Sequence, residues 1–565
     1  MCQKHSHLGF AQESNIEAAT ADGQGHSMLC LVSCFLKNTF LASIALLIAY
    51  NVLRQISSYL KLSFYRKQGI KTYYYPIIGF LKLMKPIVDK EDLQKSQIDE
   101  KEEILAFNNF RNTEPSVFLK GSELLSEFFL KETTNFERVP VIGEREDVHS
   151  FFFDFSEKGN RIRSLFTDFF RTDNINKILP KIEEIFANRL DEFRNKTWSQ
   201  EELEALKRDQ KQSSDKLWRR IKLAPVLKEA FDEMVNVILF GCVSSAKKGD
   251  NTPQDKLPDI PTIDGKLFSV YTQDFLLQSI KAMRNPFNVL TGYFFLKHRL
   301  LKEGRNVERM RMRLEIATND FYEARKAQAE ETGFGVNIID LMIQLNQRLE
   351  EEGRLDEVMD ARTIADNARI FYLAGYDTSK TNSSIAILNL AGNPSLQDRL
   401  RTEFRDLQRG HDDHILNFQA SDYVENFLKE NLRRYGPAVQ SLPRVCTKTC
   451  KLGKYTIRKG TRVQLEFGRV HMDENQYEAP FEFDAERFKE GKFGAARRQH
   501  KYLPFSAGKR ACLGQYLGEC LVKIVIKTVI ERFEVRTCEG GSRPSLRQGI
   551  ILSAGEVELE ACPLL

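Results

Sequence analysis

The chain has 565 residues, of which 42% are hydrophobic and 28% are charged, and its formal net charge is +5. This length and composition allow a large buried core and exclude a disordered chain, a collagen-like chain or a nucleic-acid-binding tail. Ten cysteines without a C-x-x-C pair exclude a small disulfide framework and are typical of free thiols in a reducing compartment.

The first distinctive element is an apolar run near the N-terminus. Residues 28–53 (MLCLVSCFLKNTFLASIALLIAYNVL) are apolar apart from Lys37 and a few small polar residues, and about 20 such residues cross a bilayer as a helix. Lys37 lies near mid-span, where a lysine is costly unless it snorkels, and a cleaved signal peptide is the alternative. The long lead before the run and the lack of a small-residue cleavage site favour a membrane anchor.

Basic residues follow this run, whereas the preceding tail holds Lys4 against three acidic residues. By the positive-inside rule, the bulk of the chain faces the cytoplasm. We therefore expect a short non-cytoplasmic tail (1–27), a transmembrane anchor (28–53), a basic linker (54–72) and one large domain (73–565). The basic residues that carry this expectation are Arg54, Lys61, Arg66, Lys67 and Lys71.

After a turn signalled by Pro76 and Gly79, the pattern is mainly helical. Apolar residues return at spacings of three and four, which predicts helices over 227–241, 311–331 and 360–393.

Strand signals come late in the chain. The segment 454–467 (KYTIRKGTRVQLEF) predicts a hairpin with Lys459 and Gly460 in its turn. The polar stretches 199–220 and 244–256 are interpreted as a solvated helix and a surface loop. We therefore predict a single large domain, mainly α with a small β part.

One cysteine lies where a loop becomes a helix. In YLPFSAGKRACLGQYLGE (502–519), Cys512 stands between Gly508 and Gly514 and follows two basic residues. A helix N-terminus offers unpaired amides and a positive dipole that stabilise a thiolate, and glycines let the backbone approach a flat ligand. Taken alone, a buried cysteine before a helix is most often inert packing.

Two further stretches place polar residues in helical segments. Glu430 and Arg433 are spaced i,i+3, for which an exposed ion pair is the plain interpretation. Gly375, Asp377 and Thr378 (AGYDTS, 374–379) interrupt a long apolar helix. A glycine there costs about 1 kcal/mol relative to alanine, and a buried Asp-Thr pair needs partners.

Jointly, these stretches resemble the cytochromes P-450. Their haem loop, F-x-x-G-x-R-x-C-x-G, is matched by Phe505, Gly508, Arg510, Cys512 and Gly514. The resemblance implies that Cys512 is the thiolate ligand of the iron of haem b, that Phe505 lies against the thiolate side and that Arg510 reaches a haem propionate.

The other stretches follow in that family's order between residues 371 and 533. By resemblance, Glu430 and Arg433 join Arg487 of FEFDAERF in a buried network, and Arg444 is a second propionate ligand. Removing one partner of such a network should cost several kcal/mol and abolish haem loading.

AGYDTS resembles the distal helix of the family. Thr378 would hold the oxygen pocket, Asp377 would deliver protons through water and Gly375 would leave room for the ligand.

Upstream of residue 371, fewer residues match the family's pattern. Aligning Arg163 with the family's haem-binding arginine places Gly159 where a tryptophan is usual, so Arg161 is the alternative for the third propionate contact.

The function that the resemblance implies is a monooxygenase that inserts one oxygen atom of O2 into a lipophilic substrate. The chain has no flavin or dinucleotide fingerprint, so electrons from NADPH would arrive through a separate flavin reductase, with a cytochrome b-type protein as a further donor. The expected location is the endoplasmic reticulum membrane, as a single-pass protein. A peroxide-rearranging isomerase or dehydratase and a non-enzymatic haem or gas-binding protein are the alternatives.

The resemblance also implies a docking surface for the electron donor and a pocket for the substrate. Basic residues around the proximal face would steer an acidic partner, with scattered solvated charge as the alternative for each: Lys158, Arg161, Arg171, Arg497, Arg498 and Lys509. A mostly apolar pocket would take a fatty acid, sterol or xenobiotic and be lined by residues 139–153, 275–296, 370–374, 439–442 and 550–552.

Overall fold

The computed structural model describes all of the candidate haem, oxygen-pocket and network residues and most of the chain. The described residues are 38–75 (except 40, 44 and 47), 102–108, 114–138, 150–152, 157–208, 217–241, 261–284 (except 265), 301–408, 421–489, 496–538 (except 498), 546–548, 552–554 and 557–564. Much of the expected substrate pocket lies outside these ranges, as do Lys37, Pro76, Gly79 and Arg498.

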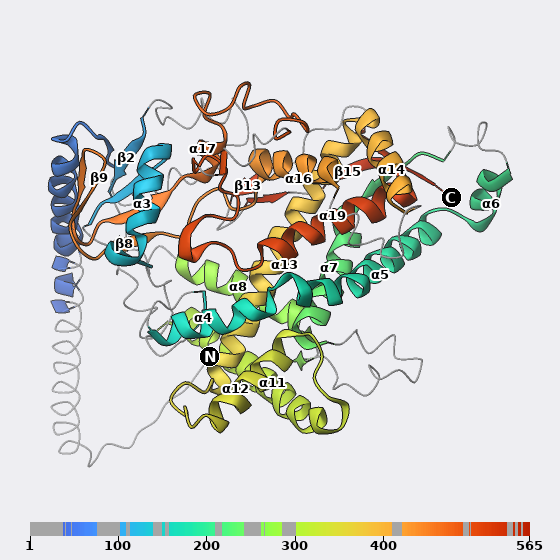
Figure 1. Ribbon diagram of the computed structural model, residues 1–565. Helices are drawn as coiled ribbons and strands as arrows, with labels where there is room; N and C mark the ends of the chain where they lie inside the picture. Colours follow the sequence, from blue (N-terminus) through green and yellow to red (C-terminus); the bar gives the residue numbers. More distant parts are fainter. Residues whose placement is uncertain are drawn as a thin grey trace, which may run out of the picture.

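Helices dominate the described chain, as the apolar periodicity predicts (Figure 1). The three helices predicted from periodicity are confirmed as parts of α7, α11 and α13. The helices are α3 (Ser122–Asn135), α4 (Glu157–Phe169), α5 (Thr172–Thr197), α6 (Gln200–Arg208), α7 (Leu223–Phe240), α8 (Phe268–Arg284), α11 (Lys302–Thr332), α12 (Ile338–Glu351), α13 (Ala361–Ala391), α14 (Pro394–Gln408), α16 (Asp422–Tyr435), α17 (Phe467–His471) and α19 (Gln515–Arg532), with a 3-10 turn, η5 (Gly508–Arg510).

The β part is small and lies mainly at one end of the molecule, beside α3 (Figure 1). Its largest sheet has the order β1-β2-β3-β11-β8-β4, from Lys71–Tyr73, Ile104–Phe107, Ser116–Leu119, Arg462–Leu465, Arg444–Cys446 and Phe136–Arg138. A three-stranded sheet has the order β12-β15-β5, from Phe533–Arg536, Glu558–Pro563 and Arg219–Lys222. Three pairs complete the set: β9 (Cys450–Leu452) with β10 (Tyr455–Ile457), β13 (Leu546–Gln548) with β14 (Leu552–Ala554), and β6 (Thr262–Ile263) with β7 (Lys266–Leu267).

The hairpin predicted over 454–467 is wrong. β10 pairs with β9 across a turn in which Gly453 has φ +55°, whereas β11 pairs with β3 and β8 in the large sheet. Gly460 has φ +86°, and its N–H donates to the Cys446 carbonyl oxygen (2.7 Å). Gly460 therefore lies in a turn, but this turn carries the chain from the β9–β10 pair into the large sheet and does not form a hairpin.

The long helix α13 runs through the centre of the helical part (Figure 1). The Asp360 carboxylate caps its N-terminus by accepting the Thr363 N–H at 2.8 Å, which satisfies one of the free amides of the first turn. Along its length α13 packs against α7, α11, α16 and α19, and most of its buried apolar residues belong to the largest buried cluster. Much of this helix is therefore surrounded by core.

The N-terminal helix spans Leu41–Arg66 in the described residues, and it is long and apolar enough to cross a membrane. Apolar side chains such as Leu46 and Leu53 are exposed, whereas Leu62 and Tyr65 are buried against the large sheet. The residues expected as a basic linker thus continue this helix as far as Arg66, and Tyr65 Oη and Thr461 Oγ1 lie 2.5 Å apart. The helix is joined to the domain by packing as well as by the chain.

Candidate active site

The α13 helix contains one stretch that the core does not cover. Ala374 is exposed although it lies in the middle of the helix, and a Cβ built on Gly375 meets nothing within 4 Å. Thr378 is partly buried, and its hydroxyl donates to the Ala374 carbonyl oxygen (2.6 Å). Asp377 forms an ion pair with Lys380 at 3.5 Å. The AGYDTS stretch therefore faces open space at small residues and carries a hydroxyl and a carboxylate at its edge.

The cysteine loop is shaped by tight backbone turns. Ser506 and Gly508 both have positive φ (62° and 73°), and the second is glycine, the residue that adopts this region without strain. The Cys512 N–H donates to the Phe505 carbonyl oxygen at 2.9 Å, which closes the loop on itself. Gly514 then precedes the first residue of α19. Cys512 consequently lies just before the helix N-terminus, as the sequence predicts.

Cys512 differs from the other cysteines of the described ranges, because it alone is exposed. Its thiol is nevertheless surrounded by protein, and this burial raises its pKa, against the smaller lowering effects of the Gly514 N–H and the Arg163 charge. Cys512 is therefore accessible to a ligand although many protein atoms surround its sulfur. A metal ion would oppose the raised pKa, because a coordinating thiol is deprotonated.

Arginines from two segments meet at the cysteine loop, Arg510 of the loop itself and Arg163 of α4. Arg163 of α4 donates to the Ala511 carbonyl oxygen at 2.5 Å, next to Cys512. Arg161 instead pairs with Glu157 (2.6 Å) and Glu357 (2.8 Å). Of the two candidates for the third propionate contact, the structure brings Arg163 to the cysteine loop.

The other two candidate propionate ligands are buried. Arg510 donates to the Phe151 carbonyl oxygen (3.4 Å) and to Asn160 Oδ1, which tie the loop to α4 and to the segment before it. Arg444, at the start of β8, donates to the Leu442 carbonyl oxygen (2.7 Å). Both guanidinium groups are thus held by neighbouring backbone, which orients them.

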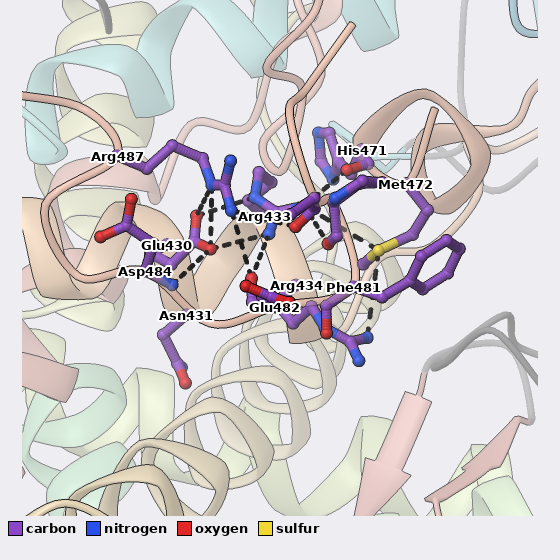
Figure 2. Close-up of polar contacts among 12 residues, drawn as sticks. Glu430, Asn431, Arg433, Arg434, His471, Met472, Phe481, Glu482, Asp484 and Arg487 are labelled. Atoms are coloured by element: carbon purple, nitrogen blue, oxygen red, sulfur yellow. Dashed lines mark hydrogen bonds and ion pairs between the residues drawn. The ribbon is translucent and has the colours of Figure 1, made fainter. Parts of the chain in front are cut away.

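The Glu430 network is assembled from segments far apart in the chain (Figure 2). Arg433 donates to both Glu430 carboxylate oxygens at 2.7 Å, and Arg487 Nε lies 3.2 Å from each of them. The Glu430 and Arg433 side chains are both 0% exposed. Arg433 also donates to carbonyl oxygens of His471 (2.7 Å) and Pro480 (2.8 Å). This buried charge is therefore fully paired, unlike the exposed ion pair that the spacing alone suggests.

His471 connects this network to the cysteine loop, and the sequence reasoning did not single it out. Its ring Nε2 accepts the Leu503 N–H at 2.9 Å, while its own carbonyl oxygen accepts from Arg433. Burial and the nearby Arg433 charge lower the pKa of His471 to about 3. Tyr477 adds a second link, because its hydroxyl donates to the Lys501 carbonyl oxygen at 2.8 Å. The only available signal was an isolated histidine in a stretch of mixed apolar and charged residues, which has no unique interpretation.

These residues fit a haem. Among the described residues one thiol is exposed, α13 has open space at a glycine, and Arg163, Arg444 and Arg510 would supply positive charge for two propionates. The described part of the chain contains no cluster of three or more His, Cys, Asp or Glu side chains able to hold a metal by themselves. The donor set therefore suits a porphyrin-held iron with one protein thiolate.

The chain belongs to the cytochrome P450 family, because the family model described as Cytochrome P450 matches residues 76–561. Among similar proteins, cytochrome P450 6a2 of Drosophila melanogaster is 32% identical over 211 residues, covering 36% of this chain and 41% of the relative. Cytochrome P450 82A2 of Glycine max is 34% identical over 206 residues (36% and 39%). Cytochrome P450 6l1 of Blattella germanica is 30% identical over 236 residues (41% and 45%). These matches span less than half of each relative.

Proposed function

We propose that this protein is a haem-thiolate monooxygenase. It inserts one oxygen atom of O2 into a lipophilic substrate RH, with NADPH as the electron source through a separate flavin reductase. The balanced reaction is RH + O2 + NADPH + H+ giving ROH + H2O + NADP+. The bound haem supplies oxygen activation, and the protein supplies binding, orientation and protons.

The observation that carries the proposal is the setting of Cys512. Its side chain is the one exposed thiol of the described residues, it stands just before α19, and Arg163 binds the adjacent carbonyl oxygen. A cysteine that only packs in a core needs no accessible surface, whereas a cysteine thiolate that binds a metal must be accessible to it. Phe505 and Gly514, which flank it in the loop, would hold haem at this position together with Arg444 and Arg510.

Thr378 and Asp377 are assigned to oxygen binding and proton delivery. The Thr378 hydroxyl donates to Ala374, so its oxygen lone pairs stay available to accept a proton donor or water. Asp377 is about one-third exposed and lies at the solvent side of the same stretch, which suits a group that exchanges protons with water. Gly375 leaves the space for O2. This arrangement favours oxygen activation over peroxide rearrangement, which needs no proton delivery.

The reductase is proposed to dock on the surface around the cysteine loop. Lys509 is exposed, and Arg497 lies in the segment that leads into the loop. Arg161 and Arg171 are already paired with Glu157 and Asp168, so their contribution to steering is smaller. Lys509→Glu should slow reductase-dependent haem reduction, and more so at low ionic strength, whereas Lys302→Glu on α11 should not. Equal slowing by both variants would contradict a specific docking face.

The N-terminal helix is proposed to anchor the protein in the endoplasmic reticulum membrane, with the domain in the cytoplasm. Support comes from the exposed apolar side chains in the first half of Leu41–Arg66 and from the basic residues between Arg54 and Lys71, in its second half and just after it. The full chain should resist carbonate extraction from membranes, and a tag at its C-terminus should be digested by protease outside intact vesicles. A protected tag would reverse the orientation.

The decisive test is the absorption spectrum of dithionite-reduced membranes with and without carbon monoxide. The wild type should show the strongly red-shifted Soret band of haem with a trans thiolate. Cys512→Ala should lose this band, and Cys520→Ala, which removes a buried thiol from the next helix, should keep it. Survival of the band in Cys512→Ala would move the ligand elsewhere.

The same preparation separates the alternatives. NADPH-dependent product in the presence of reductase supports a monooxygenase. Conversion of a lipid hydroperoxide without reductase would instead identify an isomerase or dehydratase, and a thiolate band with neither activity would identify a haem or gas-binding protein.

A further inference from the structure

Three asparagine side chains form a hydrogen-bonded chain between α13 and α16. Asn389 Nδ2 donates to Asn431 Oδ1 (2.7 Å), and Asn431 Nδ2 donates to Asn382 Oδ1 (2.6 Å) and to the Asn382 carbonyl oxygen (3.3 Å). Asn382 is 4% exposed and Asn431 is 0% exposed. Because unpaired amides are strongly unfavourable in a core, these groups hold one another in a single arrangement.

Asn431 projects from a firmly held helix. It follows Glu430, whose carboxylate binds both Arg433 and Arg487, and Figure 2 shows its side chain pointing away from that network. One face of α16 is therefore fixed by buried ion pairs, and another face presents an amide to α13. Movement of α13 against α16 has to break the bonds to Asn431.

Asn382 lies on the same face of α13 as the oxygen-pocket residues. Residues four apart share a helix face, so Ala374, Thr378 and Asn382 form one stripe over two turns. Along this stripe Ala374 is exposed, Thr378 is partly buried and Asn382 is buried. Asn382 is thus the first anchored position after Thr378, at the turn where the stripe passes from open space into the core.

We propose that Asn382 is a positioning residue that, through Asn431, fixes the axial position and rotation of α13 at Thr378. An apolar contact would tolerate several helix registers, whereas directional bonds to both the side chain and the main chain of Asn382 admit one. The inference rests on the proposed function, because that function places Thr378 in the oxygen pocket.

The primary test is hydrogen–deuterium exchange of the full chain in detergent, comparing the wild type with Asn382→Ala and Asn389→Ala. Amides of residues 374–382 should exchange about tenfold faster in Asn382→Ala, because helix exchange follows the free energy of local opening. Asn389→Ala breaks the same chain at its far end, and it should leave this segment within about twofold of the wild type. Unchanged exchange in Asn382→Ala, or equal acceleration in both variants, would overturn the proposal.

The second readout is the fate of electrons in reductase-supported turnover of 7-ethoxycoumarin as a lipophilic probe. A misplacement of Thr378 should raise hydrogen peroxide formed per NADPH by about threefold or more in Asn382→Ala, since small displacements of catalytic groups have large effects. Asn389→Ala should match the wild type. An unchanged peroxide ratio beside accelerated exchange would overturn the link to Thr378.

The double variant Asn382→Leu/Asn431→Leu covers the case in which Asn382→Ala does not fold. Replacing both buried partners by apolar groups of similar shape leaves only the partly exposed Asn389 amide without its acceptor, so this variant should load haem. It still lacks the directional bonds and should keep the faster exchange and the higher peroxide ratio, and wild-type values for both would refute the role. If the wild type itself lacks the thiolate band, the proposed function fails, and the exchange data alone decide whether Asn382 fixes α13.

Discussion

His471 should make the folded state less stable in acid, and His471→Gln should remove that dependence. The ring is 3% exposed, and burial together with the Arg433 charge lowers its pKa from 6.5 to about 3. Between these two values the unfolded chain binds a proton at this residue and the folded state does not. The stability that the neutral ring contributes is therefore complete above pH 6.5 and is lost as the pH falls toward 3.

The size of the effect follows from the same two values. Each pH unit in this window removes about 1.4 kcal/mol, so a fall from pH 7 to pH 4.5 should remove about 3 kcal/mol through His471 alone. Glutamine offers an oxygen to the Leu503 N–H but does not titrate. His471→Gln should therefore be less stable than the wild type at pH 7, and the difference should shrink by about 3 kcal/mol at pH 4.5.

The assay is urea unfolding of the full chain in detergent, followed by the fluorescence of Trp198 and Trp218. Glu466 and Glu519, whose pKa values burial raises, are present in both proteins, so their contributions cancel in the difference. His500→Gln is the matched control, because that histidine is only partly buried and its ring bonds Ser126 (2.8 Å) outside the network. Parallel stability curves for the wild type and His471→Gln would refute the reasoning.

Three further outcomes are expected. Arg325 and Asp340 pair at 2.8 Å in the core, so Arg325→Ala leaves the Asp340 carboxylate without its charge partner and with only the Gly335 N–H as a donor to it from outside its own helix. This should lower the free energy of unfolding by about 3–5 kcal/mol in urea titrations, and Arg325→Met/Asp340→Leu should recover most of the loss. Thr378→Ala should keep the haem but divert NADPH electrons to hydrogen peroxide, and an unchanged ratio of product to NADPH would count against its role. Arg433→Lys should abolish haem loading, measured from the carbon monoxide difference spectrum, whereas Arg487→Lys should only reduce it. A larger loss of haem in Arg487→Lys than in Arg433→Lys would contradict the contacts seen in Figure 2.

The helical fold could be predicted because its signals are local. Apolar spacing is set by the turn of a single helix, and α7, α11 and α13 follow it closely. The strand pairing could not be predicted, because β11 pairs with Ser116–Leu119, far away in the chain, and with Arg444–Cys446, from which β9 and β10 separate it. A turn at Gly460 indicates only that the chain changes direction, and the identity of the partner strand depends on the tertiary fold.

The candidate site also consists of residues that the sequence could predict and residues that it could not. Cys512 and Glu430 were singled out because they occur in stretches with a fixed spacing, and the resemblance supplied Arg487 as the third member of the network. His471 and Asn382 carry no such spacing, and a single polar residue in a helix is more often solvated than buried. Their contacts depend on how the fold brings together α13 with α16, and α17 with the cysteine loop.

The contacts of Arg433 explain how a network distant from Cys512 in the sequence can govern it. Arg433 holds the His471 carbonyl oxygen, and the His471 ring holds the Leu503 N–H, from which the main chain leads into the cysteine loop. Arg487 donates to Glu430 and otherwise to carbonyl oxygens earlier in the chain, so its loss first loosens the segment that precedes the loop. Loss of Arg433 removes both the charge partner of Glu430 and the support of His471. The two arginines therefore share the Glu430 carboxylate and the Glu482 carbonyl oxygen, but only Arg433 also contacts His471, so the path of contacts from the ion pairs to the cysteine loop runs through Arg433.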